Sequence, residues 1–214
     1  MKIKKWKLTI IIACGIALVI GLIKKQEYTN IMADENNLFL FSVAPLHNDM
    51  LPDSLDEYID LLTNSPIILR VKASGKREYT AKTIKQHVQI VEVYKGTHIN
   101  EGEEIDILTT RMFLNLDDMT LNLGFTNLLK KDNEYLVFFD EKINSPYPKD
   151  NVYRISELLI NPVFNYRDVP NTIIENKRYV PYSSVSENEF MVGDSVSLKK
   201  ILLFKQKLLS KYPQ

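Results

Sequence analysis

Residues 87–109 read HVQIVEVYKGTHINEGEEIDILT, and this stretch decides the fold. A run rich in β-branched residues ends at a Lys95-Gly96 turn signal, and a polar crossing then leads to two isoleucines that alternate with Asp106. Alternation of this kind is the period of a half-buried strand. The stretch predicts a β-hairpin, so the rest of the chain can be placed by asking what pairs with the hairpin or covers it.

The first strand of this hairpin changes phase along its length. Within residues 83–94, Val88 and Ile90 share one face of an extended chain, whereas Val91 and Val93 belong to the other. A β-bulge would produce this change, and so would a strand that is buried on both faces. Both alternatives favour a curved or closed sheet.

Further strands are predicted where short apolar runs lie between turn residues. These runs cover residues 38–43, 67–72, 105–110, 134–140, 153–155, 163–166 and 188–192. Residues 73–76 (ASGK) form a turn signal, so we expect the strand before them to end there. The run EYLVFFD at 134–140 has aromatic residues on both faces, which is typical of a central strand in a barrel or sandwich.

Two helices are predicted in the body of the chain. Apolar residues recur at helical spacing from Leu51 to Leu62, with acids in the early turns. Near the C-terminus, Gly193-Asp194-Ser195 is a cap signal. The following helix carries an apolar stripe of Leu198, Ile201, Leu202, Leu208, Leu209 and Tyr212. We expect that stripe to pack against the sheet and the surrounding lysines to face water.

The N-terminus predicts a single membrane-spanning helix. Leu8 to Ile23 contains no charged residue, Trp6 precedes it, and lysines flank both of its ends. Four lysines lie before the run and two after it, which places the N-terminus in the cytoplasm and the body outside. The predicted divisions are a membrane anchor at 1–25, a juxtamembrane stalk at 26–37 and an extracytoplasmic β-rich domain at 38–214.

Two alternatives compete with an uncleaved anchor. A cleaved signal peptide needs small residues just beyond the apolar run, and Gly21 to Lys25 provides no such site. A lipoprotein would use Cys14 in Ile-Ile-Ala-Cys, but most of the apolar run follows that cysteine rather than preceding it. We therefore expect an integral cell-membrane protein whose N-terminal helix is anchored in the lipid bilayer.

Charge and cysteine content exclude several classes of function. Six of the 27 basic residues flank the apolar run, so the remainder has 21 basic and 27 acidic residues, a formal charge of −6. A mildly acidic body is a poor binder of phosphate backbones, so no nucleic acid partner is expected. Cys14 is the only cysteine, so no intramolecular disulfide and no C-x-x-C site can form.

Four short segments together resemble a known kind of domain. They are SPIILRV at 65–71, IVEVYKG at 90–96, a Gly-x-x-Ile-x-Ile strand at 102–107 and LLKKDNEYLVFF at 128–139. This pattern resembles exported bacterial OB-fold-like domains, which are similar to the barrel of tissue inhibitors of metalloproteinases and netrin modules. The resemblance covers about residues 64–140 and implies a five-stranded barrel. Those inhibitors use an N-terminal cysteine against the catalytic metal, and this body has no cysteine.

The expected fold is therefore mainly β (α+β), an OB-like barrel or sandwich with flanking helices, on a single N-terminal transmembrane helix. The expected function is an extracytoplasmic binding or interaction module with an envelope protein as partner and without catalysis. OB-like barrels bind across one sheet face and its loops. By that analogy the binding residues are Arg70, Lys72 and Tyr94, together with the loop 111–131.

Two rival interpretations stay open, an immunity or inhibitor protein that binds one partner and an envelope hydrolase. A hydrolase would use the acids Asp49, Asp53, Asp56, Glu57 and Asp60, or a metal held by His98, Glu101, Glu103 and Glu104. The acids equally suit a helix start, and the histidine lacks a rigid ligand spacing. The chain has no G-x-S-x-G or P-loop motif. We expect no catalytic residue, no metal and no cofactor.

Overall fold

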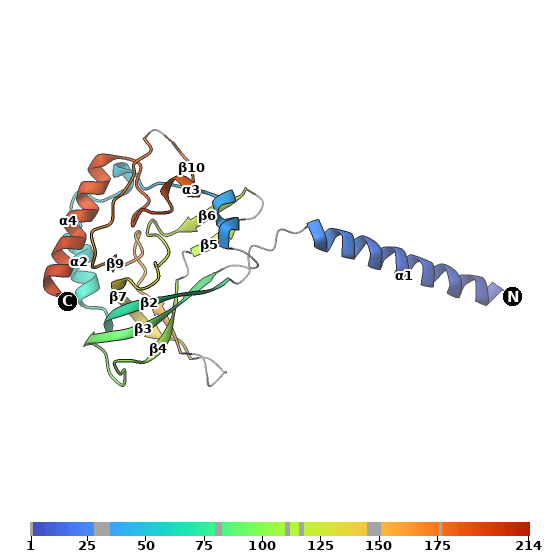
Figure 1. The fold of residues 1–214 in the computed structure, drawn as a ribbon, viewed down its shortest axis with the longest axis horizontal. Helices are drawn as coiled ribbons and strands as arrows, with labels where there is room; N and C mark the ends of the chain where they lie inside the picture. Colours follow the sequence, from blue (N-terminus) through green and yellow to red (C-terminus); the bar gives the residue numbers. More distant parts are fainter. Residues whose placement is uncertain are drawn as a thin grey trace. The chain divides into compact units, whose positions relative to one another are not determined.

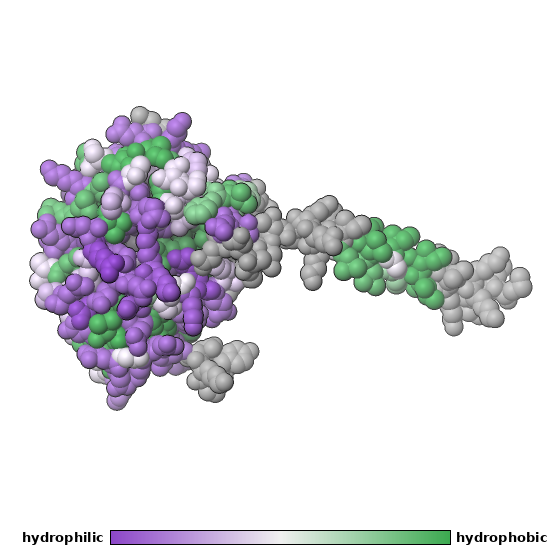
Figure 2. All heavy atoms as spheres, in the orientation of Figure 1, coloured by the Kyte–Doolittle hydropathy of each residue, from purple (hydrophilic) through white to green (hydrophobic). Residues whose placement is uncertain are grey.

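The computed structural model describes residues 2–27, 35–79, 83–109, 112–115, 118–144, 151–175 and 177–214. They form two compact units, Met1–Asn37 and Leu38–Gln214. The first contains the helix α1 (Lys2–Glu27), and every β-strand lies in the second (Figure 1). In Figure 2 the uncharged run of α1 is apolar, whereas the surface of the second unit is mainly hydrophilic with small apolar patches.

The expectation that α1 crosses a membrane is wrong. Among the helices of the described ranges, none is both long enough and apolar enough for a membrane span. The uncharged run from Leu8 to Ile23 would rise about 24 Å as a helix, which is less than a hydrocarbon core of roughly 30 Å. Trp6 is exposed, and the side chains of Leu8 and Ile23 lie outside the described part of the structure.

The second unit is built on a closed, mixed β-barrel of five strands. These are β2 (Ile67–Tyr79), β3 (Ile84–Lys95), β4 (Glu104–Leu108), β7 (Glu134–Lys142) and β8 (Val152–Ile155). The pairing runs β2-β3-β4-β8-β7 and returns from β7 to β2, and of these pairs only β4–β8 is parallel. This arrangement confirms a mainly β body and is consistent with an OB-like barrel.

The predicted hairpin is confirmed as β3 and β4, with Val88 opposite Ile105. Of the two causes expected for the phase change of β3, the structure shows the first, a β-bulge. Against β2, the register of β3 shifts at three places, and two of these shifts leave Val91 and Tyr94 as extra residues on β3. These β-bulges strengthen the local twist and bend the strand, and a small barrel needs such bending in order to close.

The expected turn at residues 73–76 is wrong. β2 continues past it to Tyr79, and Ser74 to Lys76 bulge out opposite the single residue His87. Gly75 adopts φ +81°, and the Ser74 hydroxyl donates a hydrogen bond to the His87 carbonyl at 2.9 Å. Residues 73–76, which suggested a chain reversal, therefore belong to a β-bulge. The residues on either side of the bulge still pair with β3.

Strand β7 is central, as its composition predicted. Its odd-numbered residues from Tyr135 to Phe139 point into the barrel, and Leu136 and Phe138 point outward. β7 pairs with β2 on one side, while β8 and β9 (Val163–Asn165) share its other side. Aromatic residues on both faces are therefore buried in two different apolar cores.

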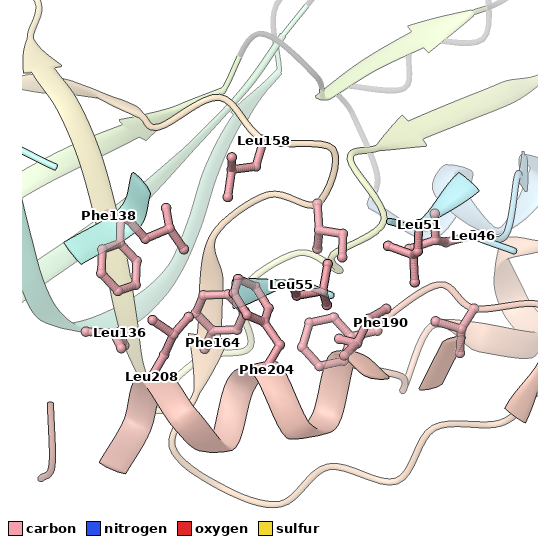
Figure 3. Close-up of a cluster of buried hydrophobic side chains, with 14 of the residues drawn as sticks. Leu46, Leu51, Leu55, Leu136, Phe138, Leu158, Phe164, Phe190, Phe204 and Leu208 are labelled. Atoms are coloured by element: carbon pink, nitrogen blue, oxygen red, sulfur yellow. The ribbon is translucent and has the colours of Figure 1, made fainter. Parts of the chain in front are cut away.

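The outer core joins the barrel to two helices, α2 (Asp56–Thr63) and α4 (Ser195–Lys211). Figure 3 shows Phe204 and Leu208 of α4 directed at Leu136 and Phe164 of the sheet. The rings of Phe164 and Phe204 meet edge to face at 5.5 Å between centroids, a favoured aromatic geometry. α4 thus covers one outer side of the barrel.

The cap of α4 is confirmed, but the prediction of its faces has two errors: Leu202 is not buried, and Lys205, which was expected to face water, is buried. Asp194 is the N-cap, and its carboxylate accepts from the Ser197 amide at 2.7 Å. Ile201 and Leu208 of the stripe are buried, but Leu202 is 39% exposed. Phe204, which the predicted stripe omitted, takes its place in the core.

A second, four-stranded sheet lies beside the barrel. Its order is β10 (Val180–Pro181), β1 (Ser42–Val43), β6 (Thr120–Leu123) and β5 (Met112–Asn115). Short helices η2 (Glu35–Leu40), η3 (Asn48–Met50) and α3 (Tyr182–Val185) accompany it. Of the strand predicted at 38–43, residues 38–40 belong to the 3₁₀ helix η2 and only Ser42–Val43 form a strand. The strand predicted at 188–192 consists of isolated bridges at Phe190 and Val192.

A buried ion pair ties α4 to the segment before it. Lys205 and Glu189 are each 5% exposed, and the ammonium lies 2.6 Å from the carboxylate. The other Glu189 oxygen accepts from the Asn165 amide of β9 at 2.8 Å. Burial raises the pKa of Glu189, and the Lys205 ammonium opposes that rise. The ion pair therefore links α4 to Glu189, and through Glu189 to β9.

Replacing Phe204 by alanine should lower the free energy of unfolding by about 3–5 kcal/mol, because it leaves a cavity in the outer core. Its neighbour Leu203 is 54% exposed, so Leu203→Ala should change that free energy by no more than about 0.5 kcal/mol. Urea unfolding of the two variants measures both values. Equal losses would show that α4 does not pack through Phe204.

Replacing Lys205 by methionine should cost about 3–5 kcal/mol, because it leaves a buried carboxylate without its cation. The double variant Lys205→Met/Glu189→Gln keeps an acceptor for the Asn165 amide and removes the charge. It should therefore be more stable than Lys205→Met alone. A double-mutant cycle by urea unfolding checks this, and additive losses would contradict the coupling.

Candidate functional site

The structure brings two of the predicted binding residues, Arg70 and Tyr94, close to each other at the place where the C-terminal residues contact the barrel. The Arg70 guanidinium lies 3.2 Å from the Glu92 carboxylate. The Tyr94 hydroxyl lies 3.0 Å from the Tyr166 hydroxyl and also donates to the Pro213 carbonyl. Burial raises the pKa of both tyrosines, so both hydroxyls stay protonated at neutral pH. This cluster holds the C-terminal residues against the barrel.

Lys72, the third predicted binding residue, lies apart from that contact and is exposed. It forms an ion pair with Asp132 at 3.6 Å. The predicted binding loop 111–131 includes strands β5 and β6 and the buried residues Leu128 and Leu129, while 111, 116 and 117 lie outside the described residues. The binding role assigned to these residues remains a prediction.

A groove of about 340 Å³ lies instead across the outer face of β3 and β4. It is lined by Ser74, Lys76, His87, Val88, Gln89, Glu104, Ile105, Asp106 and Asn151. One end of the groove lies at the bulge of β2, and the other end lies at Asn151, the residue before β8. OB-like barrels bind ligands on their second and third strands and on the loops that flank this face. β3 and β4 are the second and third strands of this barrel.

A histidine–carboxylate pair occupies the centre of the groove. His87 and Asp106 face each other in the β3–β4 register, and the His87 Nδ1 contacts the Asp106 carboxylate. The hairpin places both side chains on the outer face, because their neighbours Val88 and Ile105 point into the barrel. Both side chains remain partly exposed in the groove.

Backbone contacts hold the remaining polar side chains in place. The Gln89 amide donates to the Gly102 carbonyl at 3.3 Å, and the Asn151 amide donates to the Glu104 carbonyl at 3.0 Å. The exposed Lys76 adds a positive charge opposite Glu104 and Asp106. The groove therefore offers donors, acceptors and charges of both signs from fixed positions.

The hydroxyl group of Ser74 is the candidate nucleophile among the described lining residues of this groove. A histidine–carboxylate pair becomes a hydrolytic site when a nucleophile reaches the imidazole. The serine of this groove, Ser74, instead donates its hydroxyl proton to the His87 backbone carbonyl. Among the described lining residues there is no Phe, Tyr or Trp, so the groove lacks the row of large rings on which nucleic acid bases stack.

The other sequence candidates lie in ordinary structural settings. Asp56 and Glu57 occupy the first turn of α2, and Lys207 donates to the Asp56 carboxylate at 2.7 Å. That ammonium lowers the pKa of Asp56. His98 lies in the β3–β4 crossing with φ +59°. Across the described ranges, no three metal-ligating side chains gather in one place.

Sequence reasoning passed over the central pair. His87 belongs to no recognised motif in the sequence, and Asp106 is there only the polar residue between two isoleucines. The signal that could have found the pair is the hairpin register, which sets the two residues opposite each other. That register depends on the long crossing between the strands, so residue spacing alone did not reveal it.

No protein-family model matches this chain, and no curated protein matches it at a significant level. The structure supports the resemblance to exported OB-like domains as far as the architecture, a closed and mixed β-barrel of five strands.

Removing the Tyr94 hydroxyl should loosen the C-terminus. Tyr94→Phe loses the bonds to Tyr166 and Pro213, and we expect a loss of about 1 kcal/mol in the free energy of unfolding. Carboxypeptidase should also digest the last residues faster.

The matched control is Tyr153→Phe. The Tyr153 hydroxyl is buried and has no hydrogen-bond partner among the described residues, so its removal should be neutral or slightly stabilising. Urea unfolding compares the two variants, and the prediction fails if they lose equal stability.

Proposed function

We propose that the barrel is a non-catalytic binding module whose binding surface is the groove across β3 and β4. The observation that carries the proposal is the position of the groove. It lies on the strands where OB-like barrels bind, and it runs from the bulge within β2 to Asn151 in the connection before β8. α4 and the C-terminal residues occupy another outer side of the barrel, so that side is not available to a ligand.

The chemistry of the groove favours a protein partner. Lys76, Glu104 and the His87–Asp106 pair line the same groove, so the surface combines both signs of charge with neutral amides. Such a mixed surface discriminates between partners by charge complementarity. An inhibitor or immunity protein that binds one partner is one specific form of this function. The resemblance to exported domains also supports an extracytoplasmic location for the body.

Site-specific photo-crosslinking with the full-length chain tests the proposal in the producing cell. A photoreactive residue in place of Gln89, which lies in the groove, should give one discrete crosslinked product. The same residue in place of the exposed Lys199 on α4 is the control. Asp106→Asn should weaken binding of the partner identified by mass spectrometry about tenfold, because it removes one charge from the central pair.

Two results would overturn the proposal. One is the same product from both crosslinking positions. The other is a groove product whose yield is unchanged when His87 and Asp106 are both replaced by alanine.

A further inference from the structure

A second recess lies at the four-stranded sheet and is separate from the groove on β3 and β4. It consists of two adjoining hollows of about 260 Å³ and about 370 Å³. Both are bordered by Ala44, Phe125 and Tyr179, so the two form one continuous cleft with aromatic walls. We call it the aromatic cleft.

One wall of the aromatic cleft is held in an unusual backbone conformation. Phe125 has φ +58°, which is uncommon for a bulky residue and concentrates at functional sites. The Phe125 carbonyl accepts from the Met191 amide at 2.9 Å. The preceding Gly124 is also left-handed and packs so closely on Asn161 that a Cβ would lie 2.3 Å from its amide nitrogen. The fold therefore enforces the position of this ring.

The first hollow combines these aromatic walls with neutral and acidic polar groups. Asp118, Thr120 and Asn122 line it. The Asn122 carbonyl oxygen accepts from the Gly124 amide at 2.8 Å, which fixes the side chain and keeps its NH₂ as a donor. Tyr179 is 47% exposed, so its ring face remains accessible. A ligand here needs an apolar face for the rings and hydroxyl groups for the carboxylate and amide.

The second hollow carries the opposite charge. His47, Lys177 and Arg178 line it, together with mainly apolar neighbours. The Arg178 guanidinium lies 5.7 Å from the centroid of the Tyr179 ring, which places a cation against the shared wall. An anionic group is favoured at this end and disfavoured beside Asp118, so the cleft has a defined polarity.

We propose that the aromatic cleft binds a short acidic saccharide. One sugar ring stacks on Tyr179 and Phe125 in the first hollow, with its hydroxyl groups bonded to Asp118 and Asn122. The carboxylate of the adjacent sugar lies beside Lys177 and Arg178. Sugar rings match this lining because they present an apolar face and a rim of hydroxyl groups. This site is independent of the protein-binding groove proposed above.

Calorimetric titration of the full-length chain tests the proposal. The probes are trigalacturonate and a hyaluronate tetrasaccharide, with neutral galactotriose and a triglutamate peptide for comparison. At least one acidic saccharide should bind at least tenfold more tightly than both comparison ligands, and binding should weaken with added salt.

Two pairs of variants assign the binding to the cleft. Tyr179→Ala should lower the affinity at least tenfold, whereas Tyr179→Phe keeps the ring face and should change it less than threefold. Arg178→Gln should lower the affinity several-fold, and Lys199→Gln, which removes an exposed charge on α4, should not. Tyr179 and Arg178 are exposed, so unchanged melting temperatures should show that the variants fold.

Three outcomes would overturn the proposal: no binding of either acidic saccharide, equal binding of galactotriose, or equal binding of triglutamate. The last outcome would indicate an acidic peptide as the ligand. Crosslinking from position 89 should be the same in Tyr179→Ala as in the parent chain, so failure here is distinguishable from failure of the protein-binding groove.

Discussion

The body of this protein depends on one strand that is apolar on both faces. β7 directs Val137 and Phe139 into the barrel and Leu136 and Phe138 into the core beneath α4. It also has three strand partners, since β2 takes one side and β8 and β9 share the other. Both cores and the closure of the barrel therefore meet at residues 135–139 of this strand, which are buried on both faces.

That constraint determines which surfaces can have a function. Leu136 and Phe138 are covered only because α4 packs over them, and the C-terminal residues follow the helix onto Tyr94 and Tyr166. Polar residues on this side, such as Arg70, form ion pairs with their neighbours. The face of β3 and β4 bears no such helix, so its polar side chains remain accessible in a groove. One barrel thus separates the surface that packs against α4 from the surface that we propose binds a partner.

The four-stranded sheet shows a different use of local structure. Its strands are short, and their arrangement depends on bridges from residues near 190 and on tight packing at Gly124. These contacts hold Phe125 in a left-handed conformation beside the exposed Tyr179. Backbone strain of this kind persists only where surrounding contacts over-determine it. The resulting recess is rigid on one side and open on the other, as a preorganised binding site requires.

The sequence by itself determined the hairpin, the central strand, the capped C-terminal helix and a barrel-like body, because alternation, bulk and capping chemistry are local properties. Sequence patterns predicted α1 wrongly as a membrane span, because the apolar run is too short. They predicted residues 73–76 wrongly as a turn, because the outcome there depends on strand pairing. Only the tertiary structure decided which polar residues face water, because that depends on where α4 packs. The pairing of His87 with Asp106 and the meeting of Phe125 with Tyr179 likewise join residues far apart in the chain, and no local pattern encodes such distances.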